Sequence, residues 1–104
     1  MTSIDIGSLD DFVVDRASRH VVQGIAIAVV RIGDEVYAIG DRCSHANVSL
    51  SEGRVDCAAK GLECWRHGAE FSLETGKPSG PPAVRGVPVY VASVEDGRVL
   101  LHLR

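Results

Sequence analysis

The distribution of apolar residues favours β-strands along most of the chain. Residues 21–32 form a run rich in Val and Ile, the pair Gly33-Asp34 supplies a turn, and an apolar stretch returns at residues 36–39. β-Branched residues suit the pleated surface of a strand, and a short Gly-containing turn between two such runs is typical of a hairpin. Residues 25–40 are therefore predicted to form a β-hairpin.

A second hairpin is predicted at the C-terminal end. Apolar stretches from Val87 to Val94 and from Val99 to Leu103 flank the turn at residues 95–98, which contains Asp-Gly. This dipeptide between apolar runs is a strong hairpin signal. At the other end of the chain, residues 3–6 and 11–16 are predicted to be short strands, with residues 8–11 as the turn between them.

The middle of the chain, about residues 41–83, differs in composition. It contains five glycines and the run Pro-Ser-Gly-Pro-Pro at residues 78–82. Glycine permits the positive φ angles that tight loops need. The only helical suggestion is one short turn near residues 46–51. We predict a single all-β domain, residues 1–104, in which a small subdomain of about residues 41–83 is inserted between the N- and C-terminal strands.

Composition narrows the class of protein. The chain has 104 residues, of which 45% are hydrophobic and 24% charged, and this is ordinary for a globular domain with one apolar core. A net charge of −3 argues against a nucleic-acid partner. No apolar run approaches the roughly 20 residues of a transmembrane helix, and the N-terminus has no signal-peptide pattern. We therefore expect a cytoplasmic protein that does not bind membranes.

Two mixed pairs of metal-binding residues stand out. Cys43 and His45 form a C-x-H motif, Cys64 and His67 form a C-x-x-H motif, and 18 residues separate the two motifs. Thiolates beside imidazoles suit zinc or an iron–sulfur centre. In a Rieske [2Fe–2S] centre two cysteines hold one iron and two histidines hold the other. The i, i+2 spacing of the first pair does not fit one face of a helix, so both pairs are predicted to lie on loops.

The residues around these motifs resemble a known family. The shared segments are 43–45 (Cys-Ser-His), 49–53 (Ser-Leu-Ser-Glu-Gly), 64–71 (Cys-Trp-Arg-His-Gly-Ala-Glu-Phe), 75–77 (Thr-Gly-Lys) and 81–82 (Pro-Pro). They resemble a Rieske-type [2Fe–2S] ferredoxin of the kind that serves bacterial ring-hydroxylating dioxygenase systems. The likeness extends over the whole chain in length and strand order, and its specific part is residues 41–82.

This resemblance implies a fold, a cofactor and partners. The fold would be a stack of antiparallel sheets with the cluster-binding subdomain at one tip. Cys43 and Cys64 would hold the inner iron of one [2Fe–2S] cluster, and His45 and His67 the outer iron. The protein would be a monomeric electron carrier, not an enzyme. It would take electrons from an NAD(P)H-dependent flavoprotein reductase and pass them to a terminal non-heme iron oxygenase.

Other positions gain a role from the same resemblance. Pro81-Pro82 would cover the cluster, and Trp65 and Arg66 would lie at the rim where a partner docks. Trp65 stands where many relatives have proline, which changes the shape of that rim.

Respiratory-type Rieske domains have a disulfide between the ligand loops, but the matching positions here are Val48 and Arg66. Those domains also have a serine and a tyrosine that donate hydrogen bonds to sulfur, where this chain has Ala69 and Phe71. Such donors stabilise the reduced cluster, so their absence predicts a low potential.

Three alternatives remain open from the sequence. Two Cys and two His could hold structural zinc, although zinc motifs usually keep like ligands together. The chain could be the small subunit of a nitrite reductase, or a carrier that serves iron–sulfur assembly.

The third cysteine, Cys57, matches no ligand position and is predicted to be a small buried residue. His20 and His102 are predicted to be ordinary strand residues.

Overall fold

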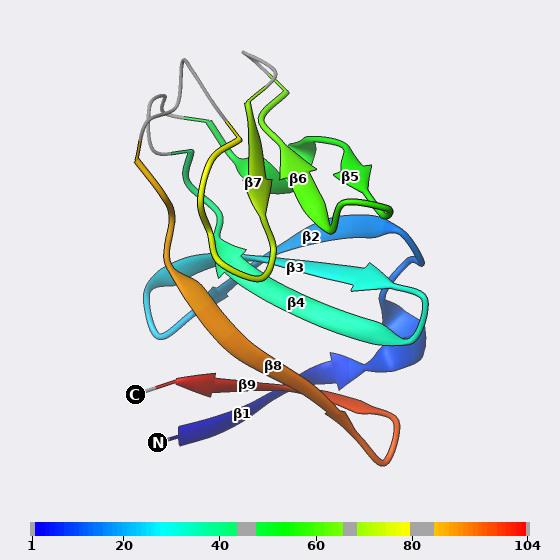
Figure 1. Ribbon diagram of the computed structural model, residues 1–104. Coiled ribbons are helices and arrows are strands. Elements are labelled where there is room, and N and C mark those ends of the chain that lie inside the picture. Colours follow the sequence, from blue (N-terminus) through cyan, green and yellow to red (C-terminus); the bar gives the residue numbers. More distant parts are fainter. Residues whose placement is uncertain (1, 44–47, 66–68, 80–84, 104) are drawn as a thin grey trace.

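The fold is built from antiparallel strands in two sheets (Figure 1). The computed structural model describes residues 2–43, 48–65, 69–79 and 85–103. Its elements are β1 (Thr2–Ser8), η1 (Leu9–Asp11), β2 (Arg16–Val22), β3 (Ile25–Ile32), β4 (Glu35–Gly40), η2 (Leu50–Glu52), β5 (Val55–Asp56), β6 (Gly61–Glu63), β7 (Glu70–Ser72), β8 (Val89–Glu95) and β9 (Arg98–Leu103). Helices η1 and η2 are single 3-10 turns.

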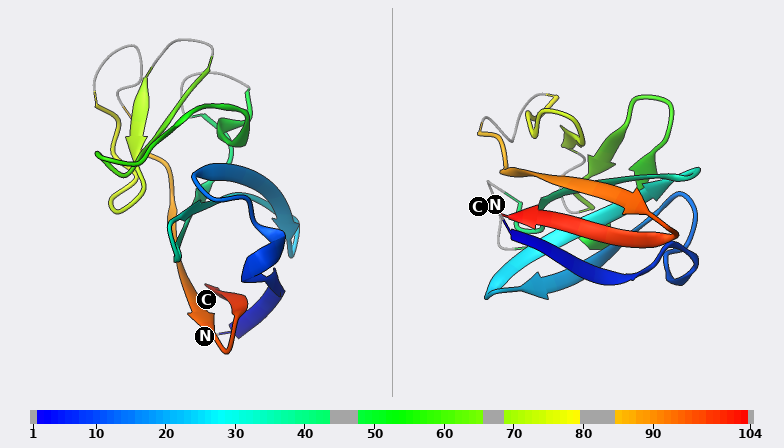
Figure 2. Two further views of the ribbon diagram at one scale, coloured as in Figure 1. Left: turned by 90° about the vertical axis from the view of Figure 1, so that its right-hand side faces the viewer. Right: turned by 90° about the horizontal axis from the view of Figure 1, so that it is seen from below.

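The strands stack in three layers. The larger sheet has the order β1-β9-β8-β4-β3-β2, and the smaller sheet has the order β5-β6-β7. In Figure 2 the larger sheet bends, so that β1, β8 and β9 form one layer and β2, β3 and β4 another, with the small sheet beyond them. The start of β1 and the end of β9 lie at the side of the molecule away from the small sheet (Figure 1).

Strand β3 explains why the first apolar run is continuous. Ile27 and Val29 face a core between the two halves of the larger sheet, whereas Ala28 and Val30 face a core beneath the small sheet. A strand buried on both faces shows no alternation of apolar and polar residues. We call the core under the small sheet the tip core. Its buried residues are Ala28, Val30, Ile39, Cys43, Leu50, Leu62, Cys64, Ala69, Phe71, Leu73 and Val87.

Both predicted hairpins are confirmed. Strands β3 and β4 pair from Ile27↔Gly40 to Ile32↔Glu35, and β8 and β9 pair from Val91↔His102 to Glu95↔Arg98. The turn of the second hairpin, Asp96-Gly97, has positive φ at both residues, as a two-residue type I′ turn requires. The all-β prediction, with stacked antiparallel sheets, is confirmed as well.

One prediction near the N-terminus is wrong, and one strand there was not predicted. The strand predicted at residues 11–16 does not form, because Ser8 and Asp11 form a capping box that ends β1 in η1, Asp15 has a φ of 60°, and the next strand begins only at Arg16. The apolar run at residues 21–32 contains a turn at Gln23-Gly24, where both φ angles are positive. Its first two residues therefore belong to β2, which pairs with β3 and was not predicted.

Candidate metal centre

Cys43 lies at the end of a short antiparallel stem that continues β4. The N–H of Leu50 donates to the carbonyl of Asp41 at 2.6 Å, and the N–H of Cys43 donates to the carbonyl of Val48 at 3.1 Å. Arg42 and Ser49 form a bridge between these two hydrogen bonds. The stem therefore closes a loop of four residues, 44–47, immediately after Cys43.

Cys64 has the same local arrangement at the end of β6. Its N–H donates to the carbonyl of Ala69 at 2.6 Å, and β6 and β7 pair below it through Leu62↔Phe71 and Glu63↔Glu70. This hydrogen bond closes a loop over residues 65–68. In both loops the cysteine N–H thus donates to the carbonyl five residues later, so the two loops have equal length.

The two cysteine thiols lie in one apolar environment. Cys43 is 2% exposed and Cys64 is 0% exposed, both belong to the tip core, and neither takes part in a disulfide. Buried soft sulfur ligands in an apolar setting fit the inner side of an iron–sulfur or zinc centre. The donor set of the chain therefore fits such a group at this tip.

The two predicted histidine ligands lie outside the described residues. His45 falls within 44–47 and His67 within 66–68, as do the predicted rim residue Arg66 and, at 80–84, the pair Pro81-Pro82. Within the described part of the chain no three metal-binding side chains gather. Cys43 and Cys64 are buried in the same core, and all four ligands stay a prediction.

The positions that distinguish this chain from respiratory-type domains are described. Ala69 is 3% exposed and Phe71 is 0% exposed, and both share the tip core with the two cysteines. Val48 is half-buried and packs against the same core. Neither Ala69 nor Phe71 has a side-chain hydroxyl to donate to sulfur. Trp65, directly after Cys64, is 52% exposed, as a residue at a docking rim would be.

The prediction for Cys57 is wrong, because this residue is exposed on the turn after β5. Local desolvation and a hydrogen bond with Asp15 raise the pKa of its thiol. A raised pKa makes a thiol less reactive at neutral pH. Cys57 is not among the tip-core residues that surround the other two cysteines.

His20 and His102 lie in strands β2 and β9, as predicted. His20 contacts Phe12, with ring centroids 5.3 Å apart, and burial lowers its pKa. His102 is hydrogen-bonded to Ser3 at 3.0 Å and to Ser93 at 2.7 Å. Both rings thus have structural partners.

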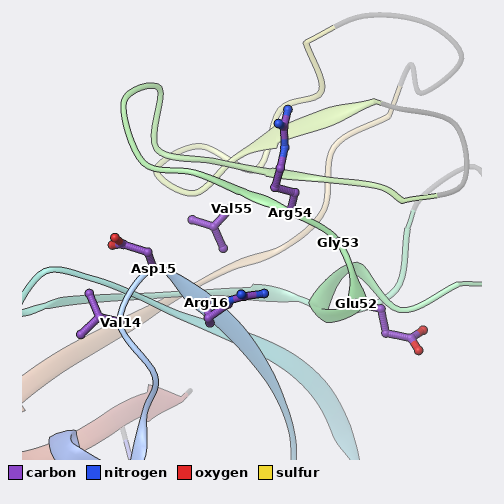
Figure 3. Close-up of a pocket in the computed structure, with 7 residues that line it drawn as sticks. All are labelled: Val14, Asp15, Arg16, Glu52, Gly53, Arg54 and Val55. Carbon is purple, nitrogen blue, oxygen red and sulfur yellow. The ribbon is translucent and has the colours of Figure 1, made fainter.

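A surface pocket lies between the loop before β2 and the segment that joins η2 to β5 (Figure 3). In Figure 3 Arg54 extends away from the opposite loop, and Asp15 and Arg16 point in different directions. The lining residues are Val14, Asp15, Arg16, Glu52, Gly53, Arg54 and Val55. Neither Cys43 nor Cys64 is among them.

One residue close to the first ligand motif was not singled out from the sequence. Asp41, two positions before Cys43, is a carboxylate that is only 2% exposed. An acidic residue directly after the apolar strand β4 was the available signal.

Among the described residues no helix is long and apolar enough to cross a membrane.

The comparisons with known proteins agree with this geometry. A family model described as "Rieske [2Fe-2S] domain" matches residues 3–91. The anthranilate 1,2-dioxygenase ferredoxin subunit of Burkholderia cepacia is 38% identical over 98 residues, which cover 94% of this chain and 89% of that protein. The 3-phenylpropionate/cinnamic acid dioxygenase ferredoxin subunit of Escherichia coli K12 is 44% identical over 77 residues, covering 74% and 72% of the two chains.

Solved structures show the same likeness. The ferredoxin of carbazole 1,9a-dioxygenase from Nocardioides aromaticivorans IC177 matches with a TM-score of 0.94 and 32% identity over the whole of both chains. A chain in a complex of reduced oxygenase and oxidized ferredoxin in carbazole 1,9a-dioxygenase matches with a TM-score of 0.85 and 32% identity, covering 95% and 91% of the two chains.

This chain belongs to the Rieske [2Fe–2S] family. Its relatives are ferredoxin subunits, so it is a Rieske-type ferredoxin, an electron-transfer protein with a Rieske-type [2Fe–2S] cluster as its cofactor. A structure described as "putative NADH-dependent nitrite reductase small subunit from Mycobacterium tuberculosis" matches with a TM-score of 0.86 over 96% of this chain and 93% of that one, but at 24% identity. That match shows a shared fold alone.

Proposed function

We propose that this protein is the ferredoxin component of a ring-hydroxylating dioxygenase system. It carries one electron at a time from an NAD(P)H-dependent flavoprotein reductase to a terminal non-heme iron oxygenase, as a monomer in the cytoplasm. The relatives that support this assignment are ferredoxin subunits of aromatic-acid dioxygenases, and a similar ferredoxin has been solved in complex with its oxygenase.

Cys43, His45, Cys64 and His67 are the proposed ligands. When bound, a Rieske-type cluster supplies reversible one-electron chemistry, with two cysteines on one iron and two histidines on the other. The observation that carries the ligand proposal is the pair of equal loops, each closed by a cysteine N–H, with both thiols buried in one core. The apolar tip core excludes water from the thiol side of the site.

Trp65 is the proposed docking residue. Its side chain is 52% exposed although it directly follows a fully buried cysteine, so an apolar ring is presented at the rim of the site. Tryptophan is enriched in the parts of protein interfaces that carry most of the binding energy. Electron-transfer encounters bury little surface, so one such ring can account for a large share of the contact.

Iron analysis and an EPR spectrum test the proposed ligands. We expect two irons per chain, a red-brown colour, and a reduced signal with an average g below that of all-cysteine clusters. One zinc per chain with no visible absorption would contradict the cofactor, and a signal of the all-cysteine type would contradict the histidine ligands.

Reconstitution tests the proposed partners. Electron flow from NAD(P)H through a flavoprotein reductase to an oxygenase of the relatives' class should require the ferredoxin. Trp65→Ala should slow this flow while leaving the iron content and the reduction potential unchanged. A carrier that serves iron–sulfur assembly would instead be reduced without supporting oxygenase turnover.

A further inference from the structure

Asp41 is the one buried charged side chain among residues 2–43, 48–65, 69–79 and 85–103. Removing a carboxylate from water is costly unless it is paired and hydrogen-bonded. The cost is incurred here two positions before Cys43, at the base of the first ligand loop. The contacts of Asp41 indicate what the buried charge does.

Every polar group of Asp41 has a partner. Oδ1 accepts the N–H of Ser51 at 2.9 Å, and Oδ2 accepts the Nε–H of Arg19 at 3.2 Å. The backbone N–H of Asp41 donates to the carbonyl of Ala26 at 3.1 Å, and its carbonyl accepts the N–H of Leu50 at 2.6 Å. One residue therefore ties the end of β4 to β2, to β3 and to η2.

These contacts fix the stem that presents Cys43. The backbone pairing runs from Asp41 and Leu50 at the base to Cys43 and Val48 at the loop. The carboxylate extends this pairing by one further hydrogen bond, to the N–H of Ser51, so η2 cannot rotate away from β4 without breaking it. The position of Cys43 thus depends on Asp41.

The two charges of the Arg19–Asp41 ion pair are unequally exposed to solvent. The side chain of Asp41 is 2% exposed, whereas that of Arg19 is 54% exposed. Water screens the exposed guanidinium more than the buried carboxylate, so Arg19 offsets the negative field of Asp41 only in part. A negative field disfavours the addition of an electron nearby.

We propose that Asp41 is a positioning residue for Cys43 and that its buried charge, partly offset by Arg19, lowers the reduction potential of the bound cluster. This inference rests on the proposed ligand role of Cys43. It predicts that neutral substitutions of Asp41 and of Arg19 shift the reduction potential in opposite directions, because the first removes a negative charge and the second removes a positive charge.

The test is a redox titration of three variants as iron-loaded protein. Asp41→Asn keeps an acceptor for the Ser51 N–H and removes the charge, so the potential should rise. Arg19→Gln should lower the potential by a smaller amount because Arg19 is half-exposed. Arg19→Lys keeps the positive charge and should therefore have the same reduction potential as the wild type. Iron content and thermal unfolding are measured for each variant.

Asp34→Asn is the matched control. Asp34 is paired with Arg31 at 3.2 Å and lies before β4, at the opposite end of that strand from Asp41. Removing this exposed carboxylate should leave the potential unchanged.

A purely structural role would lower the thermal stability of the variants and leave their potentials equal to the wild type. That result, or shifts of the same sign for Asp41→Asn and Arg19→Gln, would overturn the inference. If Asp41→Asn does not retain iron, the comparison of Arg19→Gln with Arg19→Lys decides: equal potentials overturn the proposal. A wild-type protein without an iron–sulfur cluster would instead refute the proposed function itself.

Discussion

The side chain of Glu70 on β7 lies across Gly61 on β6. A Cβ built on Gly61 would be 2.6 Å from the carboxyl carbon of Glu70, so the glycine provides the space that the glutamate occupies. Across this space the carboxylate of Glu70 reaches that of Asp56 on β5. The outer strands of the small sheet therefore hold two acidic groups together over the central strand.

Glu70 should make the stability of the protein depend on pH. Burial and then the neighbouring Asp56 raise the pKa of Glu70. A pKa that is higher in the folded chain means that folding favours the protonated group. The stabilising effect of that proton is fully present below the unfolded-state pKa and is lost as pH rises through the raised folded-state pKa.

Glu70→Gln should therefore stabilise the protein at pH 7 and have little effect at pH 4. Because solvent screens the pair, the gain at pH 7 should be at most about 1 kcal/mol. Thermal unfolding at both pH values measures the difference, with Glu52→Gln, at an exposed position of η2, as the control. An equal effect of Glu70→Gln at both pH values would show that the carboxylate pair is not the cause.

Gly53→Ala should destabilise the fold by steric overlap. The φ of Gly53 is −86°, which any residue can adopt, yet a Cβ there would overlap the carbonyl oxygen of Glu63. Glu63 directly precedes Cys64, so the overlap would displace the second ligand loop. Overpacking against backbone costs about 3 kcal/mol.

Gly24→Ala is the control for that substitution. Gly24 has a φ of 78°, and a Cβ there would have no atom within 4 Å, so the cost is backbone strain alone, about 1 kcal/mol. Urea unfolding compares the two variants. Equal losses would mean that close approach to β6 is not what requires glycine at position 53.

The hairpins could be predicted because their turns are local signals. Asp96-Gly97 and Gly33-Asp34 mark reversals within two residues, and the strands beside them are apolar. The turn at Gln23-Gly24 was hidden because β3 is buried on both faces and its apolar run merges with the end of β2. Continuous burial removes the period-2 pattern that would have located the strand end.

The error about Cys57 and the omission of Asp41 have one physical origin. The burial of Asp41 depends on Arg19, 22 residues earlier and on another strand. Cys57 is exposed on the turn after β5, where it forms a hydrogen bond with Asp15 of a distant segment. Both are consequences of how distant segments meet, and neither the residue type nor its neighbours in sequence determines them.

The cysteines should separate into two groups when each is replaced by serine. Cys43→Ser and Cys64→Ser should abolish the red-brown colour and the bound iron, because each removes a buried thiol of the tip core. Cys57→Ser should leave iron content and potential unchanged, because Cys57 is exposed on the turn after β5. Loss of iron in Cys57→Ser alone would contradict the ligand assignment.

The wild-type reduction potential should lie near the lower end of the Rieske range of about −150 to +300 mV. Ala69 and Phe71 are buried with Cys43 and Cys64 in the tip core, and neither has a hydroxyl group that could donate to sulfur. Such donors draw charge from sulfur and favour the reduced state. Their absence should keep the potential low.

Hydroxyl groups at these positions should raise the potential. Ala69→Ser adds one atom beside the carbonyl that accepts the N–H of Cys64, and Phe71→Tyr adds a hydroxyl to a fully buried ring. The double variant should show the larger rise, because each hydroxyl adds a donor. Ala92→Ser, next to the other core, is the control and should not change the potential. Protein-film voltammetry measures the wild type and the four variants. A wild-type value well above zero would show that another donor compensates for Ala69 and Phe71.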